Sequence, residues 1–470
     1  MTIRLQRRPD GWRRWLVASV AGSAVLGGVL VLLPGGPGQL WARGPAAAPA
    51  PGPAAMAHDA VAAGVPAALP ELAVLIGDRE ARVRARPLEA PSWAVLGAAY
   101  VEQGRRTADP AHFPKAERAL RTALRLKESP AALEGLAALA VARRDFPGAK
   151  RWGEAARRLA PKRWTTQAVL IDAYTGLGDH QAVGRALDRL VALRPGTAAV
   201  RARKAAVYRD RGWREDAAAQ LTDAVAAAGT PAERAAYLEQ AGRLAFERGD
   251  RAEALRYFQE ALRTDPDQRA AQAGQGRALA ALGRTSQALT AYQAALDRQP
   301  RPEDALELGE LYESLGLGQA ARVQYDLLRE RVRAAAASGA DEELVLGRFE
   351  AEHGDARAAV RRLRAEWRRQ PSTAVADALG WALYRAGRAE EALGYAVRAT
   401  DGERGGGVRS AAYVYHRGVI EGELERYGAA RRHLQEAARI NPWFSPLDAP
   451  RLRQALAELG EPSAEGPPSR

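Results

Sequence analysis

Cysteine is absent from this chain of 470 residues. Its absence excludes disulfides, thiolate metal sites, thiol nucleophiles and a lipid-modified N-terminal cysteine. Asparagine occurs only at Asn441, and lysine supplies only five of the 69 basic residues. Alanine, arginine, glycine and proline dominate instead, as a GC-rich coding sequence would produce. For that reason no inference is based on a single alanine or arginine.

Motifs of the common catalytic and nucleotide-binding sites are also missing. The chain contains no GxxxxGK, no HExxH and no GxGxxG at a strand-to-helix junction. Its six histidines show none of the i, i+3 or i, i+4 pairs that place two metal ligands on one helix face. His416 and His433 fall on successive predicted helices and could meet in space, although an ordinary packing role is the simpler interpretation. We therefore expect no enzymatic activity, no cofactor and no metal.

The length, composition and charge of the chain limit the kinds of protein that it can be. A chain of 470 residues is too long for one small core, so several domains or a repeat array are expected. Hydrophobic residues make up 47% and charged residues 27%, a balance typical of folded proteins. The net charge is +13, and five arginines near the N-terminus supply part of it. The remaining positive charge favours binding to an acidic partner or an anionic surface. Positive and negative residues are nevertheless interspersed along the chain.

Residues 15–33 form an uncharged, largely apolar run of 19 residues. As a helix this run spans roughly 28 Å, close to the ~30 Å hydrocarbon thickness of a bilayer. Five arginines precede it, which predicts a cytoplasmic N-terminus and an extracytoplasmic main body. The alternative is a signal peptide that is cleaved downstream, so that the protein is secreted. Ser23 and Gly27 form a small-xxx-small pair that would allow self-association of the helix.

The next segment, residues 34–67, contains seven prolines with many alanines and glycines and has no apolar period. Such a segment predicts a flexible linker that holds the following domain away from the membrane.

A sequence period of about 34 residues runs through residues 92–443. Gly249, Ala254, Phe258, Ala261 and Pro266 recur 34 positions later, and the corresponding residues are Gly283, Ala288, Tyr292, Ala295 and Pro300. Small residues allow two helices to approach closely, and the glycine and the proline end the first and the second helix. The period therefore predicts stacked pairs of helices.

These positions resemble the tetratricopeptide repeat, whose pattern is W-x2-L-G-x2-Y followed by Ala, Phe, Ala and Pro. Trp93, Leu96, Gly97 and Tyr100 match its opening residues, and about ten copies cover some three quarters of the chain. The resemblance implies an all-α fold, an α-solenoid forming a right-handed superhelix of about ten helix-turn-helix repeats with a concave groove. One copy departs from the pattern by an insert at residues 105–113, between its two helices.

The predicted segments follow one another in this order: a basic cytoplasmic tail (1–14), a transmembrane helix (15–33), a flexible linker (34–67), an N-terminal capping helix (68–91), the repeats (92–443), a C-terminal capping helix (444–460) and a disordered tail (461–470).

The resemblance also implies that the first helix of each repeat lines the groove. The partner-binding candidates at the groove positions are Asp172, Arg243, Arg277, Glu310, Arg348, Trp381, Tyr384, Arg385 and Tyr415. Arg243 and Arg277, in adjacent repeats, could pair with carboxylates of an extended peptide. Trp381, Tyr384 and Arg385 form an amphipathic cluster of the kind enriched at interaction hot spots. The alternative is a solvated arginine pair and a tryptophan packed between repeats.

We therefore expect a non-catalytic scaffold that binds protein or peptide ligands, acidic ones among them. It is expected to be anchored in the cytoplasmic membrane with its repeats outside. The alternative function is a basic protein that binds nucleic acid or an anionic envelope polymer. Its affinity would then be uniform and salt-sensitive, whereas a scaffold would capture a defined protein at higher salt.

Overall fold

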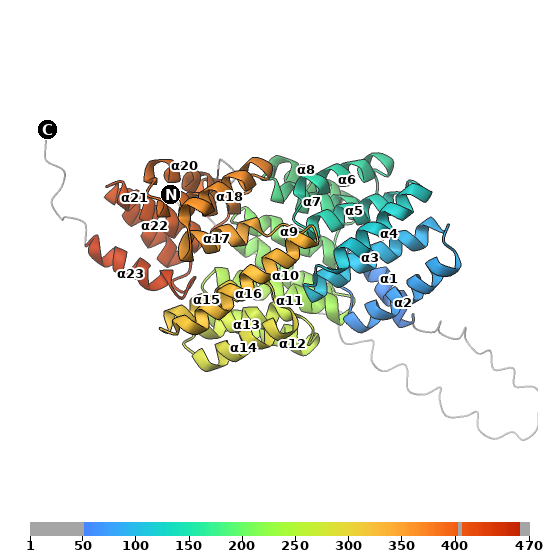
Figure 1. Ribbon diagram of the computed structural model, residues 1–470, viewed down its shortest axis with the longest axis horizontal. Helices are drawn as coiled ribbons and strands as arrows, with labels where there is room; N and C mark the ends of the chain where they lie inside the picture. The colour runs from blue at the N-terminus through green and yellow to red at the C-terminus, as the bar shows by residue number, and fades with distance from the viewer. Residues whose placement is uncertain (1–50, 403–406, 461–470) are drawn as a thin grey trace, which may run out of the picture. The chain divides into compact units, whose positions relative to one another are not determined.

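The computed structural model describes residues 51–402 and 407–460, and all 23 helices within these ranges are α-helices (Figure 1). The helices are α1 (Pro53–Ala62), α2 (Leu69–Ala85), α3 (Ala90–Thr107), α4 (His112–Leu126), α5 (Pro130–Ala142), α6 (Phe146–Leu159), α7 (Trp164–Gly176), α8 (His180–Leu193), α9 (Ala198–Asp210), α10 (Arg214–Ala227), α11 (Pro231–Glu247), α12 (Arg251–Thr264), α13 (Arg269–Ala281), α14 (Thr285–Arg298), α15 (Pro302–Ser314), α16 (Gly318–Ala337), α17 (Glu343–His353), α18 (Ala356–Arg369), α19 (Thr373–Arg385), α20 (Ala389–Thr400), α21 (Ala411–Glu423), α22 (Tyr427–Ile440) and α23 (Asp448–Glu458).

Helices α3 to α22 pair in sequence into ten hairpins, from α3/α4 to α21/α22. The odd-numbered helix is the first of each hairpin and also contacts the first helix of the next hairpin at most junctions. The prediction of an all-α repeat solenoid is thereby confirmed. Among the described residues no helix is both long and apolar enough to cross a membrane. The predicted transmembrane helix, basic tail and C-terminal disordered tail lie outside the described residues.

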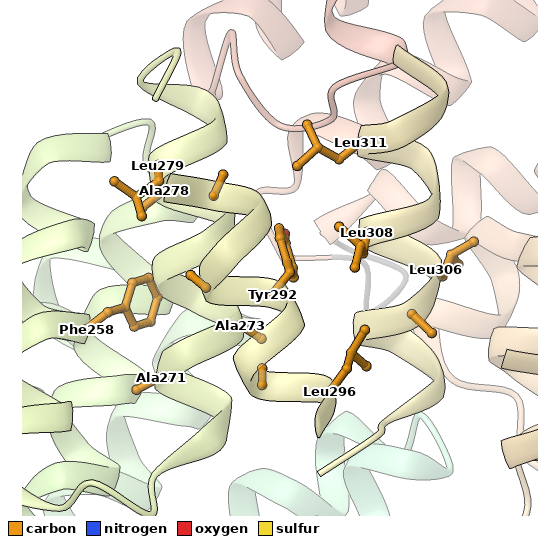
Figure 2. Packing of buried hydrophobic residues seen from close by; sticks show 14 of the residues in the cluster. Phe258, Ala271, Ala273, Ala278, Leu279, Tyr292, Leu296, Leu306, Leu308 and Leu311 are labelled. Atoms are coloured by element: carbon orange, nitrogen blue, oxygen red, sulfur yellow. The ribbon is translucent and has the colours of Figure 1, made fainter. Parts of the chain in front are cut away.

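In most hairpins a glycine of the first helix leaves room for a large side chain of the second helix. Phe258 of α12 is fully buried and lies against Gly242 of α11 and Gly274 of α13 (Figure 2). A Cβ atom added at Gly242 or Gly274 would lie 2.7 Å or 2.5 Å from the Phe258 ring, so neither position can accept a side chain unless the ring moves. The pattern repeats one hairpin later, where Gly276 faces the ring of Tyr292.

The turn inside nine of the ten hairpins contains a residue with positive φ, and in the turn between α17 and α18 Gly354 instead has φ −140°. Gly283 has φ +74°, and the amide of the next residue, Arg284, then donates to the carbonyl of Leu279 at 2.9 Å. This arrangement is the glycine-ended helix terminus that the sequence period predicted. Several second helices are then started by an aspartate, as at α8, where Asp179 accepts from the Ala182 amide at 2.9 Å.

The predicted flexible linker is wrong in its second half, because residues Pro53–Ala62 form α1. Ala57 and Ala60 of this helix are buried, and they belong to the same core cluster as Leu72 and Leu75 of α2. The composition of residues 34–67 suggested that no core could form, but alanine has high helix propensity and needs only a neighbouring apolar surface. The helix α2 provides that surface.

Hairpins far apart in the sequence also contact one another along a row of polar contacts that we call the seam. Arg106 at the end of α3 donates to Asp265 at 2.6 Å and to Gln268 at 3.1 Å, and its carbonyl accepts from Gln299 at 2.8 Å. Further along, Asn441 Nδ2 donates to the carbonyl of Phe246 at 2.8 Å. The solenoid is thus wound tightly enough for its later hairpins to rest on its earlier ones.

A second polar cluster of the seam joins α5 to α15 and α17. Arg144, directly after α5, forms an ion pair with Glu303 and lies 3.3 Å from Glu342. Burial acts to raise the pKa of both carboxyl groups. The pKa of Glu303 is nevertheless lowered, because Arg144 and Arg301 outweigh its burial, whereas the pKa of Glu342 stays raised by burial and by the neighbouring carboxylates. Of the two carboxylates, Glu303 makes the closer contact with the Arg144 guanidinium.

The insert at residues 105–113 has a structural role in this arrangement. Its first residues lengthen α3 to Thr107 and its last two belong to α4, so that only residues 108–111 lie between the two helices. The added turn carries Arg106, which is buried, into the seam.

Candidate binding groove

The first helices of the first five hairpins, α3, α5, α7, α9 and α11, line a cavity of about 580 Å³ together with the end of α1. We call this cavity the alanine groove because its lining includes one or two half-buried alanines from each of four of these helices. These are Ala98, Ala138, Ala168, Ala199 and Ala206. Side chains this small leave the inner face recessed and apolar, so the winding of the solenoid creates an open volume here.

The charged groups around the alanine groove form ion pairs with one another. Arg105 pairs with Glu102 at 2.7 Å, Arg163 pairs with Glu134 at 2.6 Å, and Arg203 pairs with Asp172. Asp172, one of the predicted partner-binding residues, therefore lies in the groove and is held by a neighbouring repeat. The lining is therefore mainly apolar, and the charged side chains around it are neutralised by ion pairs with one another.

Three polar side chains of the groove lining form no hydrogen bond. Gln240 of α11 and the indole nitrogen of Trp164 are free of hydrogen-bond partners among the described residues. His58 of α1 has a buried Nδ1 without a partner. An amide side chain can both donate to and accept from a peptide backbone, and an indole can donate. The Gln240 amide and the Trp164 indole are therefore available to a ligand, unlike the paired charges.

Beyond the alanine groove, the first helices carry large charged side chains at the inner positions. Arg277 of α13 is held by Glu307 of α15 in a bidentate contact of 2.7 and 3.0 Å. Glu310 lies 3.5 Å from Nε2 of His353. Arg243 and Arg348 form no ion pair with other described residues. The suggested joint capture of peptide carboxylates by Arg243 and Arg277 is therefore not favoured, because Arg277 already has its carboxylate.

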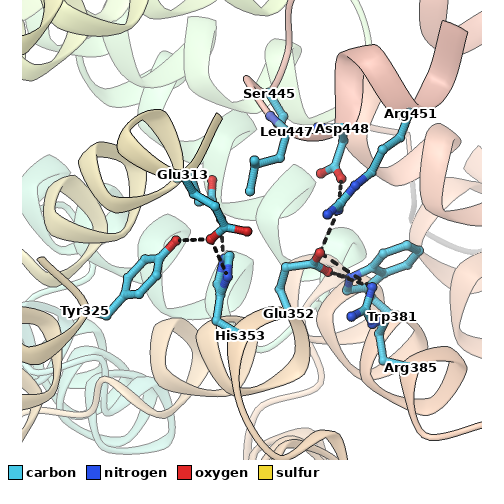
Figure 3. Close-up of polar contacts among 11 residues, drawn as sticks. Glu313, Tyr325, Glu352, His353, Trp381, Arg385, Ser445, Leu447, Asp448 and Arg451 are labelled. Atoms are coloured by element: carbon cyan, nitrogen blue, oxygen red, sulfur yellow. Dashed lines mark hydrogen bonds and ion pairs between the residues drawn. The ribbon is translucent and has the colours of Figure 1, made fainter. Parts of the chain in front are cut away.

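The aromatic cluster predicted near the C-terminus is mostly buried. Trp381 is 8% exposed and donates its indole N–H to Glu352 of α17 at 3.1 Å, and Arg385 lies 3.4 Å from the same carboxylate (Figure 3). The ring of Tyr384 is 5.1 Å from that of Trp381, and Tyr415 is 3% exposed. The alternative interpretation, a tryptophan packed between repeats, is therefore correct for Trp381.

The two histidines that share the last hairpin bind different carboxylates. His416 Nδ1 lies 2.9 Å from Asp377, and His433 Nδ1 lies 2.5 Å from Glu421. Burial lowers the pKa of His416, but Asp377 outweighs that effect and raises it. In the part of the chain that the structure describes, no group of histidines and carboxylates is arranged to hold a metal ion. Each histidine thus has a carboxylate of its own, Asp377 of α19 for His416 and Glu421 of α21 for His433.

Sequence reasoning missed the alanine groove. Its signal was a run of small residues at the inner positions of the first repeats, where later repeats carry arginine, glutamate or tryptophan. Because alanine is frequent throughout the chain, that run did not stand out from the composition.

Comparison with known proteins supports the repeat assignment for the middle of the chain. Residues 239–303 and 274–336 match the family model described as tetratricopeptide repeat. No curated protein matches the sequence.

Three of the similar solved structures come from bacteria. A thermophilic tetratricopeptide repeat protein of Thermus thermophilus is 21% identical over 39% of this chain and 99% of its own, with a TM-score of 0.35. A tetratricopeptide repeat protein of Parabacteroides merdae is 17% identical over 56% and 99%, with a TM-score of 0.33. The pilF protein of Pseudomonas aeruginosa is 18% identical over 43% and 91%, with a TM-score of 0.36.

Proposed function

We propose that this tetratricopeptide repeat protein is a non-catalytic scaffold that binds a protein partner in the alanine groove. The observation that carries the proposal is the alanine lining itself, which leaves about 580 Å³ open between the first helices of the first five hairpins. Ligand pockets commonly have volumes of roughly 300–1,000 Å³. The groove is thus large enough to receive several side chains of a peptide segment.

The chemistry of the groove favours an uncharged segment. The arginines Arg105, Arg163 and Arg203 are all paired, so they offer no free positive charge to an acidic peptide. Small recesses between alanines accept apolar side chains, and Gln240 can bind the peptide backbone. We therefore expect a partner segment with small apolar side chains, in place of the acidic ligand that the net charge suggested.

Site-specific crosslinking tests this proposal. A photo-crosslinking amino acid in place of Ala199, in the groove, is expected to give discrete adducts with one or a few proteins in living cells. The matched control position is Val323, which is 60% exposed on the second helix α16 and should give none of these adducts. Identical adducts from both positions, or none from Ala199, would contradict the proposal.

We further propose that residues 15–33 anchor the scaffold in the cytoplasmic membrane with the repeats outside. The support is the uncharged run of 19 residues and the arginines before it. A reporter enzyme that works only outside the cytoplasm, fused after Arg470, is expected to be active and to sediment with membranes. Activity of a cytoplasm-only reporter at the same position would show the opposite orientation, and a freely soluble active fusion would indicate cleavage of the segment.

A further inference from the structure

The segment that follows the last hairpin lies on the inner face of the final repeats. The ring of Phe444 packs against Tyr415 of α21, with ring centroids 5.5 Å apart. Arg451 of α23 then donates to Glu352 of α17 at 2.6 Å and to Asp448 at 3.0 Å (Figure 3). Leu452 is buried in the hydrophobic cluster of the last repeats. The segment therefore occupies the surface on which the sequence predicted the aromatic binding cluster.

The segment packs on the last repeats mainly through partly buried side chains, which are those of Phe444, Ala455, Leu456 and Leu459. Of the eleven residues of α23, only Ala449 and Leu452 are buried. Arg451 is the helix's single ion pair to the repeats, and its side chain is 43% exposed. The side chain of Glu352 is 13% exposed, so only the arginine end of this ion pair is open to solvent. The helix therefore has fewer fully buried side chains than α21 or α22, the helices of the hairpin before it.

The carboxylate beneath the segment would remain paired if the segment left. Glu352 also accepts from the indole of Trp381 at 3.1 Å and lies 3.4 Å from Arg385. A buried carboxylate without any partner would carry a large penalty. Because Trp381 and Arg385 remain as partners of Glu352, the departure of Arg451 does not leave this carboxylate unpaired. The surface beneath the segment is therefore stable enough to be exposed.

The chain directly before the segment is attached separately. Asn441 is bonded to the Phe246 carbonyl in the seam, and the guanidinium of Arg251 stacks over the ring of Trp443 at 4.2 Å. Residues 444–459 can therefore move away while Asn441 and Trp443 keep their contacts. At the far end the segment is held by Arg431, which donates to the carbonyl of Leu459 at 2.6 Å.

We propose that residues 444–459 are a displaceable internal ligand, and that a partner protein binds in their place through an amphipathic helix of similar pattern. The pattern is an aromatic residue seven positions before an Arg-Leu pair, as in Phe444, Arg451 and Leu452. Once the segment has left, Tyr415 would contact the aromatic ring of the partner helix and Glu352 would bind its arginine guanidinium. The surface therefore selects a helix that carries both groups. This site is separate from the alanine groove and does not rest on it.

Hydrogen exchange of the full-length protein tests whether the segment opens. Amides of α23 are expected to exchange at least about tenfold faster than those of α21 and α22, because α23 opens without unfolding the hairpins. Equal protection of α23 and α22 would overturn the proposal, since the segment would then leave only when the repeats unfold.

Binding in trans tests whether the surface accepts another helix. The probe is a fluorescent peptide of residues 443–459, and the receptor is full-length protein with Phe444→Ala, Arg451→Ala and Leu452→Ala. We expect this variant to bind the peptide at least about tenfold more tightly than the wild type, whose site is already occupied. A control peptide carrying Phe444→Ala and Arg451→Glu should not bind.

Equal binding of both peptides, or none by a variant whose helical circular dichroism matches wild type, would overturn the proposal. If the variant does not fold, the exchange measurement on wild type decides. Neither result affects crosslinking at Ala199, so the two proposals fail independently.

Discussion

Replacing Phe258 with alanine is expected to destabilise the hairpins around α12 by about 3–5 kcal/mol. The ring is fully buried and fills the space left by two glycines, Gly242 and Gly274. Neither glycine has a side chain that can move into the cavity that the substitution creates. The stability loss should therefore lie near the upper end of the values for large-to-small changes.

The measurement is hydrogen exchange resolved by segment, because repeat arrays do not always unfold in one step. Amides of α11 to α13 should lose protection in the Phe258→Ala variant, while those of α5 and α6 should change much less. The control is Leu317→Ala, since Leu317 is 48% exposed and its loss should have little effect. A Phe258→Ala variant as stable as this control would show that the hairpins do not pack as described.

Replacing Arg106 with alanine is expected to cost about 3–5 kcal/mol and to open the seam at α3. The side chains of Arg106 and Asp265 are 6% and 11% exposed, so the substitution leaves a buried carboxylate without its cation. Because the two residues belong to hairpins far apart in the sequence, the loss should separate parts of the solenoid. We expect a larger radius of gyration by small-angle scattering, with unchanged helical circular dichroism.

Two further variants show whether the buried charge is the cause. Arg121→Ala removes an exposed i, i+4 pair with Glu117 and should change stability by only about 0–0.5 kcal/mol. The double variant Arg106→Met and Asp265→Leu removes both charges and should recover much of the lost stability. An Arg106→Ala variant with the wild-type radius of gyration would mean that the seam does not hold the hairpins together.

The repeated hairpin could be predicted from the sequence because the residues that specify it lie close together in the chain. Gly276, Tyr292 and Pro300 define two helices and their ends by spacing alone. The structure has the predicted helix pair at each of these positions. Only local packing and turn geometry are needed for that prediction.

The seam could not be predicted because its residues are unrelated by the repeat. Arg106 and Asp265 are separated by more than four repeats, and whether they meet depends on a small rotation accumulated over every hairpin between them. A period in the sequence specifies neighbours but not that accumulated rotation. The helix α1 was missed for a related reason, since its alanines are buried only because α2 lies beside them.

The candidate site was predicted only in part. Asp172 does line a cavity, but Arg277 and Trp381 are engaged by Glu307 and Glu352 from other helices. The repeat pattern shows which residues face the groove. The hydrogen-bond and ion-pair partners of those residues, however, come from neighbouring repeats. The small residues that leave the groove open were visible in the sequence but were attributed to composition.

The central claim is that the alanine groove holds the partner. Its most direct test is crosslinking from Ala199 in a protein whose groove has been filled by Ala168→Trp, since Ala168 is half-buried in the same lining. The indole should occupy the groove without disturbing the hairpins, so helical circular dichroism and α23 exchange should match wild type. The account predicts that the adducts from Ala199 disappear. Adducts of unchanged identity and yield in the filled protein would contradict it.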